Sequence, residues 1–125
     1  MTFGTTINCM DGRVQPQVHD YIKTHYNVTY VDTITSAGPS KLLAQNIDVN
    51  TINNIHERTD ISIYQHGSTV IAICGHTDCA GIKDDDETQK VFIQEACRRY
   101  RELYPQCIVI GLWLNQKFTV EKIDG

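Results

Sequence analysis

Apolar and polar residues alternate along the chain in blocks that predict strands and helices in turn. Continuous apolar or β-branched runs are typical of buried strands, and apolar positions spaced three and four residues apart are typical of helices. The expected strands span residues 3–8, 28–34, 68–74 and 107–114, with a final edge strand at 117–123. The expected helices run from Pro16 to Asn27, over Ser40–Glu57 with a break near Asn50, and from the acidic run at 84–87 onward.

This order of elements predicts an α/β fold. Strand–helix–strand repetition implies right-handed crossovers, and therefore a single three-layer domain in which helices flank a mostly parallel central sheet of four to five strands. The chain has no internal repeat or linker, so we expect one domain over residues 1–125. Ligands of such sheets bind beyond the carboxyl ends of the strands, near a reversal of strand order. Cys9 follows the first expected strand and His76 the third, so both belong to that edge.

Composition narrows the classes of partner. The 125 residues are 41% hydrophobic and carry a formal net charge of −4. An acidic chain of this kind is a poor candidate for nucleic-acid binding, which needs a basic face. No apolar stretch approaches the roughly 20 residues of a membrane span, and the N-terminus does not resemble a signal peptide. We therefore expect a cytoplasmic protein without nucleic-acid or membrane partners.

The five cysteines divide into two groups. An odd number of cysteines in a cytoplasmic chain argues against a disulfide framework. Cys74, Cys97 and Cys107 lie in apolar or amphipathic runs, where a thiol packs as a small hydrophobic group. Cys9 and Cys79 instead lie in polar, glycine-flanked segments, which makes them candidates for chemistry.

Two of the segments that follow strands carry a set of zinc-binding side chains. Cys9, His76 and Cys79 offer two thiolates and one imidazole, which suit a tetrahedral zinc ion with the fourth position open, as in catalytic sites. In an extended chain, residues 9, 11 and 13 project to the same side. Arg13 is then expected to hold the Asp11 carboxylate beside the metal through two hydrogen bonds. Asp11 either ligates zinc or accepts a hydrogen bond from zinc-bound water.

The sequence resembles the β-class carbonic anhydrases over roughly residues 6–123. The family pattern Cys-x-Asp-x-Arg appears at 9–13, and a Gly-His-x-x-Cys-Gly-like segment appears at 75–81. The resemblance implies zinc ligation by Cys9, His76 and Cys79, with Asp11 and Arg13 as the family's orienting pair. Asp11 also matches the residue that ligates zinc in the closed form of some members.

The chain departs from the family pattern at several places, including a short segment after Gly81. Thr35-Ser36 stands where the family has Arg-Asn in an Arg-Asn-Ala-Gly loop, and Ala80 stands where the family has a glycine. The chain also begins eight residues before Cys9, so we expect no counterpart of the N-terminal arm that wraps the partner subunit in the family.

The function implied by the resemblance is that of a zinc-dependent lyase. Such a carbonate dehydratase hydrates carbon dioxide reversibly to bicarbonate with zinc-bound hydroxide, is at least a homodimer, and uses backbone N–H groups near Gly38 to place its small-molecule substrate. Three alternatives stay open: a hydrolase of carbonyl sulfide or carbon disulfide with the same chemistry, a non-catalytic zinc-binding protein whose fourth position Asp11 fills, and a metal-free thiol enzyme with Cys79 as nucleophile and His76 as base. No residue is identified as a proton shuttle.

Overall fold

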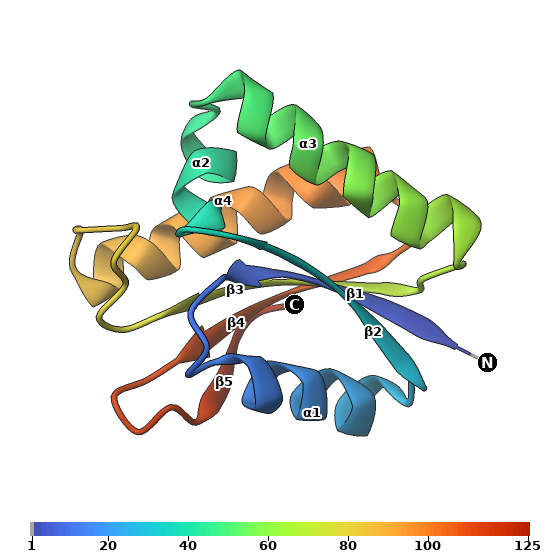
Figure 1. The fold of residues 1–125 in the computed structure, drawn as a ribbon, viewed down its shortest axis with the longest axis horizontal. Coiled ribbons are helices and arrows are strands. Elements are labelled where there is room, and N and C mark those ends of the chain that lie inside the picture. Colours follow the sequence, from blue (N-terminus) through green and yellow to red (C-terminus); the bar gives the residue numbers. More distant parts are fainter. Residues whose placement is uncertain (1) are drawn as a thin grey trace.

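The computed structural model describes residues 2–125, in which strands and helices alternate along the chain (Figure 1). The first half contains one edge strand, one inner strand and three α-helices: β1 (Phe3–Cys9), α1 (Gln15–Tyr26), β2 (Tyr30–Ser36), α2 (Pro39–Gln45) and α3 (Val49–Asp60). A short π-helical turn, η1 (Ile61–Gln65), continues α3. The second half contains β3 (Val70–His76), α4 (Asp86–Leu103), β4 (Ile108–Leu114) and β5 (Val120–Asp124).

The five strands form one sheet in the order β2-β1-β3-β4-β5. The first four are parallel, and β5 pairs antiparallel with β4. The chain leaves β1 toward β2 on one side, whereas β3 pairs with the other side of β1, so strand order reverses between β1 and β3. Cys9 and His76 are the last residues of these two neighbouring strands, which places both at the reversal point where α/β sheets bind ligands.

Helices cover both faces of the sheet (Figure 1). On one face, Val18 and Ile22 of α1 pack against inward side chains of β3 and β4, including Ala72 and Leu112. On the other face, α2, α3 and α4 cover a second cluster that contains Ile7, Ile73, Ile93, Tyr100 and Trp113. The expected three-layer α/β fold with a mostly parallel sheet is therefore confirmed.

The predicted helix over Ser40–Glu57 is two helices. The expected break is present, but it lies at residues 46–48 rather than near Asn50. Asn46 and Asp48 adopt left-handed backbone conformations with φ of 53° and 59°, which end α2 and start α3. The Asp48 carboxylate then caps α3 by accepting the backbone N–H of Thr51. The ability of Asn and Asp to adopt positive φ explains why the chain turns there.

Other boundaries shift by a few residues. β3 begins and ends two residues later than predicted, so His76 is the final residue of the strand. The last strand is shorter than the expected 117–123, because residues 115–119 form a turn in which Phe118 has a φ of 55°. The acidic run precedes α4 as expected, and Asp85 caps that helix by accepting the N–H of Thr88 at 2.8 Å. Within residues 2–125, no helix combines the length and hydropathy that crossing a bilayer requires.

Candidate metal centre

Three potential metal ligands meet at the reversal point of the sheet. The Sγ atoms of Cys9 and Cys79 lie 3.8 Å apart, and these atoms and a ring nitrogen of His76 all lie within 4.8 Å of one another. All three side chains are buried. The structure thus brings together the three residues that the sequence singled out, from the ends of β1 and β3 and from the turn that follows β3.

A short turn carries Cys79 back toward the end of β1. The turn is anchored to β4 by the N–H of Thr77, which donates to the Leu114 carbonyl at 3.0 Å. It is anchored to α4 by the Thr77 hydroxyl, which donates to the carboxylate of Asp86 at 3.1 Å. Asp78 adopts a left-handed conformation with φ of 56°, which reverses the chain and directs Cys79 inward. Local backbone geometry therefore explains the spacing of two residues between His76 and Cys79.

The His76 ring is oriented by its own backbone neighbour. Its Nδ1 lies 2.7 Å from the Thr77 carbonyl oxygen, which can only accept a hydrogen bond, so Nδ1 carries the proton. Nε2 is then left with its lone pair facing the cluster. Among the described residues this buried nitrogen has no hydrogen-bond partner. An unpartnered buried acceptor is destabilising, and a bound cation removes that penalty.

The two sulfurs share negative charge. The hydrogen bond from Cys79 lowers the pKa of Cys9 to about 4, against the effect of burial, with further help from His76. The same bond raises the pKa of Cys79, as does burial. Burial lowers the pKa of His76, but the negative charge of the neighbouring Cys9 and the hydrogen bond to the Thr77 carbonyl outweigh it, so that pKa lies above its ordinary value. All three shifts indicate a site that attracts positive charge.

Backbone N–H groups from two loops surround the sulfurs. The backbone N–H groups of Asp11 and Gly38 lower the pKa of Cys9, and those of Gly81 and Ile82 act in the same direction on the pKa of Cys79. Hydrogen bonds of this kind stabilise thiolates and fix their orientation. The predicted role of N–H groups near Gly38 in placing a substrate stays a prediction.

Two glycines allow these loops to pack backbone to backbone. Gly38 has a φ of 62°, and a Cβ there would lie 2.5 Å from Cγ1 of Ile82. A Cβ on Gly81 would lie 2.6 Å from the carbonyl carbon of Ala37. Both distances are shorter than any side chain tolerates, so close contact between the two loops depends on glycine at both positions.

The Asp11–Arg13 pair forms as expected at the edge of the cluster. Arg13 Nη2 lies 2.7 Å from Asp11 Oδ2, and Arg13 Nε lies 3.1 Å from both carboxylate oxygens. These bonds and the backbone N–H of Arg13 lower the pKa of Asp11 to about 2. Asp11 Oδ2 also lies 3.9 Å from Nε2 of His76, so the ionised carboxylate faces the three donors.

The backbone that creates this pair differs from the prediction. Residues 10–14 form a turn, not the extended chain that would project 9, 11 and 13 to one side. Within it the Asp11 carboxylate accepts the backbone N–H of Arg13 at 2.8 Å, and the Asp11 carbonyl accepts the N–H of Val14. The expected contact was therefore correct and its expected geometry was wrong, because aspartate caps its own turn more readily than it continues a strand.

Two supporting residues were missed from the sequence. The Gln15 amide donates to the carbonyls of Cys9 and Asp11, each at 2.9 Å. Asn8, fully buried in β1, donates to the Gln15 side-chain oxygen at 2.9 Å. Together they hold the turn that presents Asp11. The one available signal was an asparagine inside a strand, where a buried amide needs partners.

Comparison with known proteins agrees with this fold. The chain is similar in structure to a carbonic anhydrase from Glaciozyma antarctica (TM-score 0.65, 14% identity, covering 95% of this chain and 80% of that chain). It is also similar to the β-carbonic anhydrase CcaA (TM-score 0.62, 15% identity, 100% and 81% coverage) and to a tetrameric β-carbonic anhydrase from Sordaria macrospora (TM-score 0.61, 12% identity, 95% and 79% coverage). At such identities these likenesses establish the fold alone.

Sequence comparison establishes the family. A search of curated proteins gave no match. A family model described as "Putative carbonic anhydrase" matches residues 1–124, nearly the whole chain. The chain therefore belongs to the carbonic anhydrase family that this model describes.

Proposed function

We propose that this protein is a zinc-dependent carbonate dehydratase that interconverts carbon dioxide and bicarbonate. Cys9, His76 and Cys79 would hold the metal. The observation that carries the proposal is the buried Nε2 of His76, which faces two thiols and has no hydrogen-bond partner among the described residues. Two sulfurs and one imidazole form a donor set that suits zinc and leaves one position free.

Each ligand is prepared for a cation by its surroundings. Zinc in such an open site supplies a nucleophile at neutral pH, because it lowers the pKa of a coordinated water from 15.7 to about 7. The hydrogen bond from Cys79 lowers the pKa of Cys9, which favours its thiolate form. Binding of the metal would displace the proton that Cys79 shares with it. His76 contributes a neutral nitrogen whose direction the Thr77 carbonyl maintains.

Asp11 would act as an orienting base beside the metal. Arg13 engages both of its carboxylate oxygens, and the low pKa keeps them ionised at any physiological pH. Oδ2 faces the cluster and can accept a hydrogen bond from the attacking group, directing its lone pair toward the substrate carbon. Because Arg13 binds both carboxylate oxygens, Asp11 is better placed to orient the attacking group than to ligate the metal. The fourth position of the metal would then stay free.

The surroundings of the cluster suit an uncharged substrate. Ala44, Ile82 and Phe92 pack around Cys9 and Cys79 in a buried apolar group. Carbon dioxide is small, linear and uncharged, so it has little hydration to lose among apolar side chains. Carbonyl sulfide and carbon disulfide share these properties, so their hydrolysis is measured beside the hydration of carbon dioxide.

The thiol-enzyme alternative finds less support. A nucleophilic cysteine needs a lowered pKa and access to substrate. Cys79 is buried, and its hydrogen bond to Cys9 raises its pKa. The thiolate character lies on Cys9, whose sulfur is enclosed by N–H donors.

We further propose that the protein self-associates. The Sordaria macrospora relative is described as tetrameric. Sedimentation velocity at micromolar concentration should give a dimer or a larger species, and a monomer alone would contradict this part of the proposal.

The test combines zinc content with carbon dioxide hydration. Wild-type protein should hold one zinc per chain and hydrate carbon dioxide in a stopped-flow pH-indicator assay, whereas Cys79→Ser should lose both. Cys107→Ser is the matched control, because the Cys107 thiol donates to the Ser68 carbonyl and lies outside the cluster. Zinc with hydrolysis of the sulfur compounds alone would select the hydrolase. Zinc without any turnover would indicate a binding protein, and activity that survives chelation would indicate thiol chemistry.

A further inference from the structure

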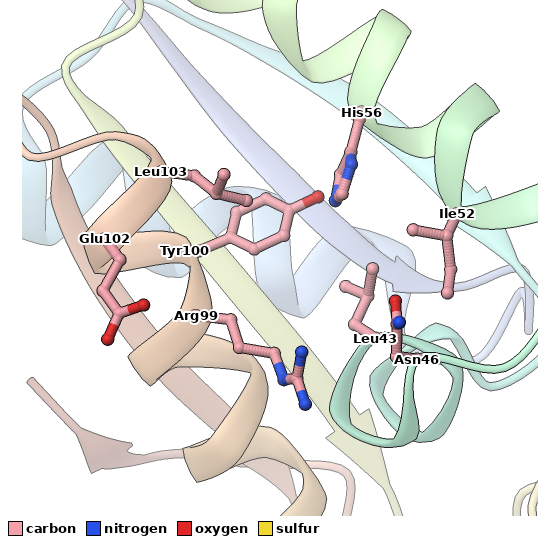
Figure 2. A pocket seen from close by; sticks show the side chains of 8 residues that line it. All are labelled: Leu43, Asn46, Ile52, His56, Arg99, Tyr100, Glu102 and Leu103. Atoms are coloured by element: carbon pink, nitrogen blue, oxygen red, sulfur yellow. The ribbon is translucent and has the colours of Figure 1, made fainter. Parts of the chain in front are cut away.

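A pocket lies between α2, α3 and α4, on the face of the sheet opposite α1 (Figure 2). This α2–α3–α4 pocket has a volume of about 230 Å³. Within the described chain, none of its lining residues belongs to the Cys9–His76–Cys79 cluster. The lining combines apolar and hydrogen-bonding side chains: Leu43, Asn46, Ile52, His56, Arg99, Tyr100, Glu102 and Leu103.

The pocket contains a buried hydroxyl without a partner. Tyr100 is 1% exposed, and its hydroxyl has no hydrogen bond within residues 2–125. Thr59 lies nearby, but its hydroxyl donates its proton to the Ile55 carbonyl at 2.8 Å and makes no bond of ordinary length to Tyr100. Buried tyrosine hydroxyls normally have a partner, and the next tyrosine on α4, Tyr104, bonds to Asp60. The Tyr100 hydroxyl can therefore donate a hydrogen bond to a bound ligand.

The pocket also contains an arginine whose charge is poorly neutralised. The two nearby carboxylates, Glu95 and Glu102, are both paired with Arg98. Arg98 donates two hydrogen bonds of 2.6 and 3.0 Å to Glu95 and one of 3.0 Å to Glu102. Arg99 is left with a 3.5 Å contact between Nε and Glu95, without hydrogen-bond geometry. In the described chain its two terminal nitrogens have no protein acceptor. Such a planar guanidinium matches a carboxylate through two parallel bonds.

The Arg99 guanidinium and the Tyr100 hydroxyl are separated from each other. Apolar side chains line the pocket as well. Figure 2 shows the Arg99 guanidinium and the Tyr100 hydroxyl at opposite ends of the labelled side chains, the hydroxyl beside His56. The His56 and Tyr100 rings are tilted, with centroids 5.5 Å apart. His56 makes no hydrogen bond to the described residues, so a change of its rotamer can open the hydroxyl to a ligand. Leu43 and Ile52 supply the apolar wall.

We propose that the α2–α3–α4 pocket binds a small oxo-monocarboxylate, with its carboxylate on Arg99 and its carbonyl oxygen on the Tyr100 hydroxyl. The short hydrocarbon part lies against Leu43 and Ile52. This site is separate from the metal centre, and it stands whether or not the metal centre hydrates carbon dioxide.

Three probes separate the two polar contacts by isothermal titration of the full chain. 4-Oxopentanoate presents both groups, pentanoate lacks the carbonyl, and 4-oxopentanamide lacks the charge. Loss of one good hydrogen bond weakens affinity by about tenfold, and loss of a charged pair by at least as much. We therefore expect 4-oxopentanoate to bind about tenfold more tightly than pentanoate and at least tenfold more tightly than 4-oxopentanamide.

Two variants and one control assign each preference to a residue. Tyr100→Phe should abolish the preference for 4-oxopentanoate over pentanoate, while stability in urea is unchanged or increased, because the hydroxyl lacks a partner. Arg99→Met should abolish the preference for the carboxylate over the amide. Tyr104→Phe removes a hydroxyl outside the pocket and should leave all three affinities unchanged. No binding of 4-oxopentanoate at tens of millimolar, or preferences that persist in Tyr100→Phe and Arg99→Met, would overturn the proposal.

Discussion

The imidazole of His76 is held by the residue that follows it, because Nδ1 donates to the Thr77 carbonyl at 2.7 Å. The bond needs no distant partner, since a single peptide unit sets both the tautomer and the direction of Nε2. Thr77 in turn is fixed to β4 through its N–H and to α4 through its hydroxyl. The strand end, its turn and the neighbouring helix therefore jointly aim one nitrogen at two sulfurs.

The role of Asp11 is tested by Asp11→Asn. The substitution keeps the shape of the side chain and removes its charge. If Asp11 orients the attacking group without binding zinc, the variant should keep one zinc per chain, and kcat/KM for hydration should fall about 10- to 100-fold, the usual effect of changing a group just outside the ligands. Zinc analysis and stopped-flow assays measure both quantities. Loss of zinc to the extent seen in Cys79→Ser would instead make Asp11 a ligand, and full activity would remove its proposed role.

Arg13→Met should change the acid dependence of stability. The folded protein holds the Asp11 pKa near 2, below the ordinary 3.8, because Arg13 binds the carboxylate. As pH falls, the unfolded chain takes up this proton first, so the stabilisation is present above about pH 4 and is lost between about pH 4 and pH 2. In Arg13→Met the free energy of unfolding should fall less over that interval, as measured by urea denaturation.

An NMR titration of the Asp11 carboxyl carbon gives the matching direct measurement. Its pKa should move from about 2 in the wild type toward 3.8 in Arg13→Met. A pKa that stays near 2 in the variant would show that Arg13 is not the cause of the shift.

Gly38→Ala should disturb both the fold and the metal centre, and Gly67→Ala is its matched control. Both glycines have positive φ, 62° and 72°, so both variants incur the backbone penalty of about 1–2 kcal/mol for a left-handed residue. A Cβ at Gly67 meets nothing within 4 Å, whereas at Gly38 it collides with Ile82. Gly38→Ala should therefore lose more unfolding free energy than Gly67→Ala and bind zinc more weakly. Equal stability and equal zinc affinity in the two variants would contradict the proposed packing of the two loops.

Much of the fold was predictable because its three inner strands, β1, β3 and β4, are buried on both faces. Parallel strands between two helical layers read as continuous apolar runs, and the run at 68–74 is of this kind. Adjacent strand ends meet at one edge, so the sequence alone predicts that Cys9 and His76 lie together. The position of the break between α2 and α3 was harder to predict, because several Asn and Asp residues in 46–54 are equally able to adopt positive φ.

The finer architecture of the site depends on backbone paths that residue patterns do not specify. The Asp11–Arg13 contact arises from a turn, whereas the spacing of residues 9, 11 and 13 predicted an extended chain. The loops of Gly38 and Gly81 approach each other closely only because neither glycine has a side chain. The unpartnered hydroxyl of Tyr100 likewise depends on how three helices meet, since the periodicity of α4 marks Tyr100 only as a core position.

X-ray absorption at the zinc K-edge, on wild-type protein loaded with one zinc per chain, tests the central claim most directly. The account predicts a first shell of two sulfur donors and one imidazole nitrogen, completed by one further light atom, with one sulfur lost in Cys9→Ser. A shell without sulfur, or one unchanged when Cys9 or Cys79 is replaced by serine, would contradict it.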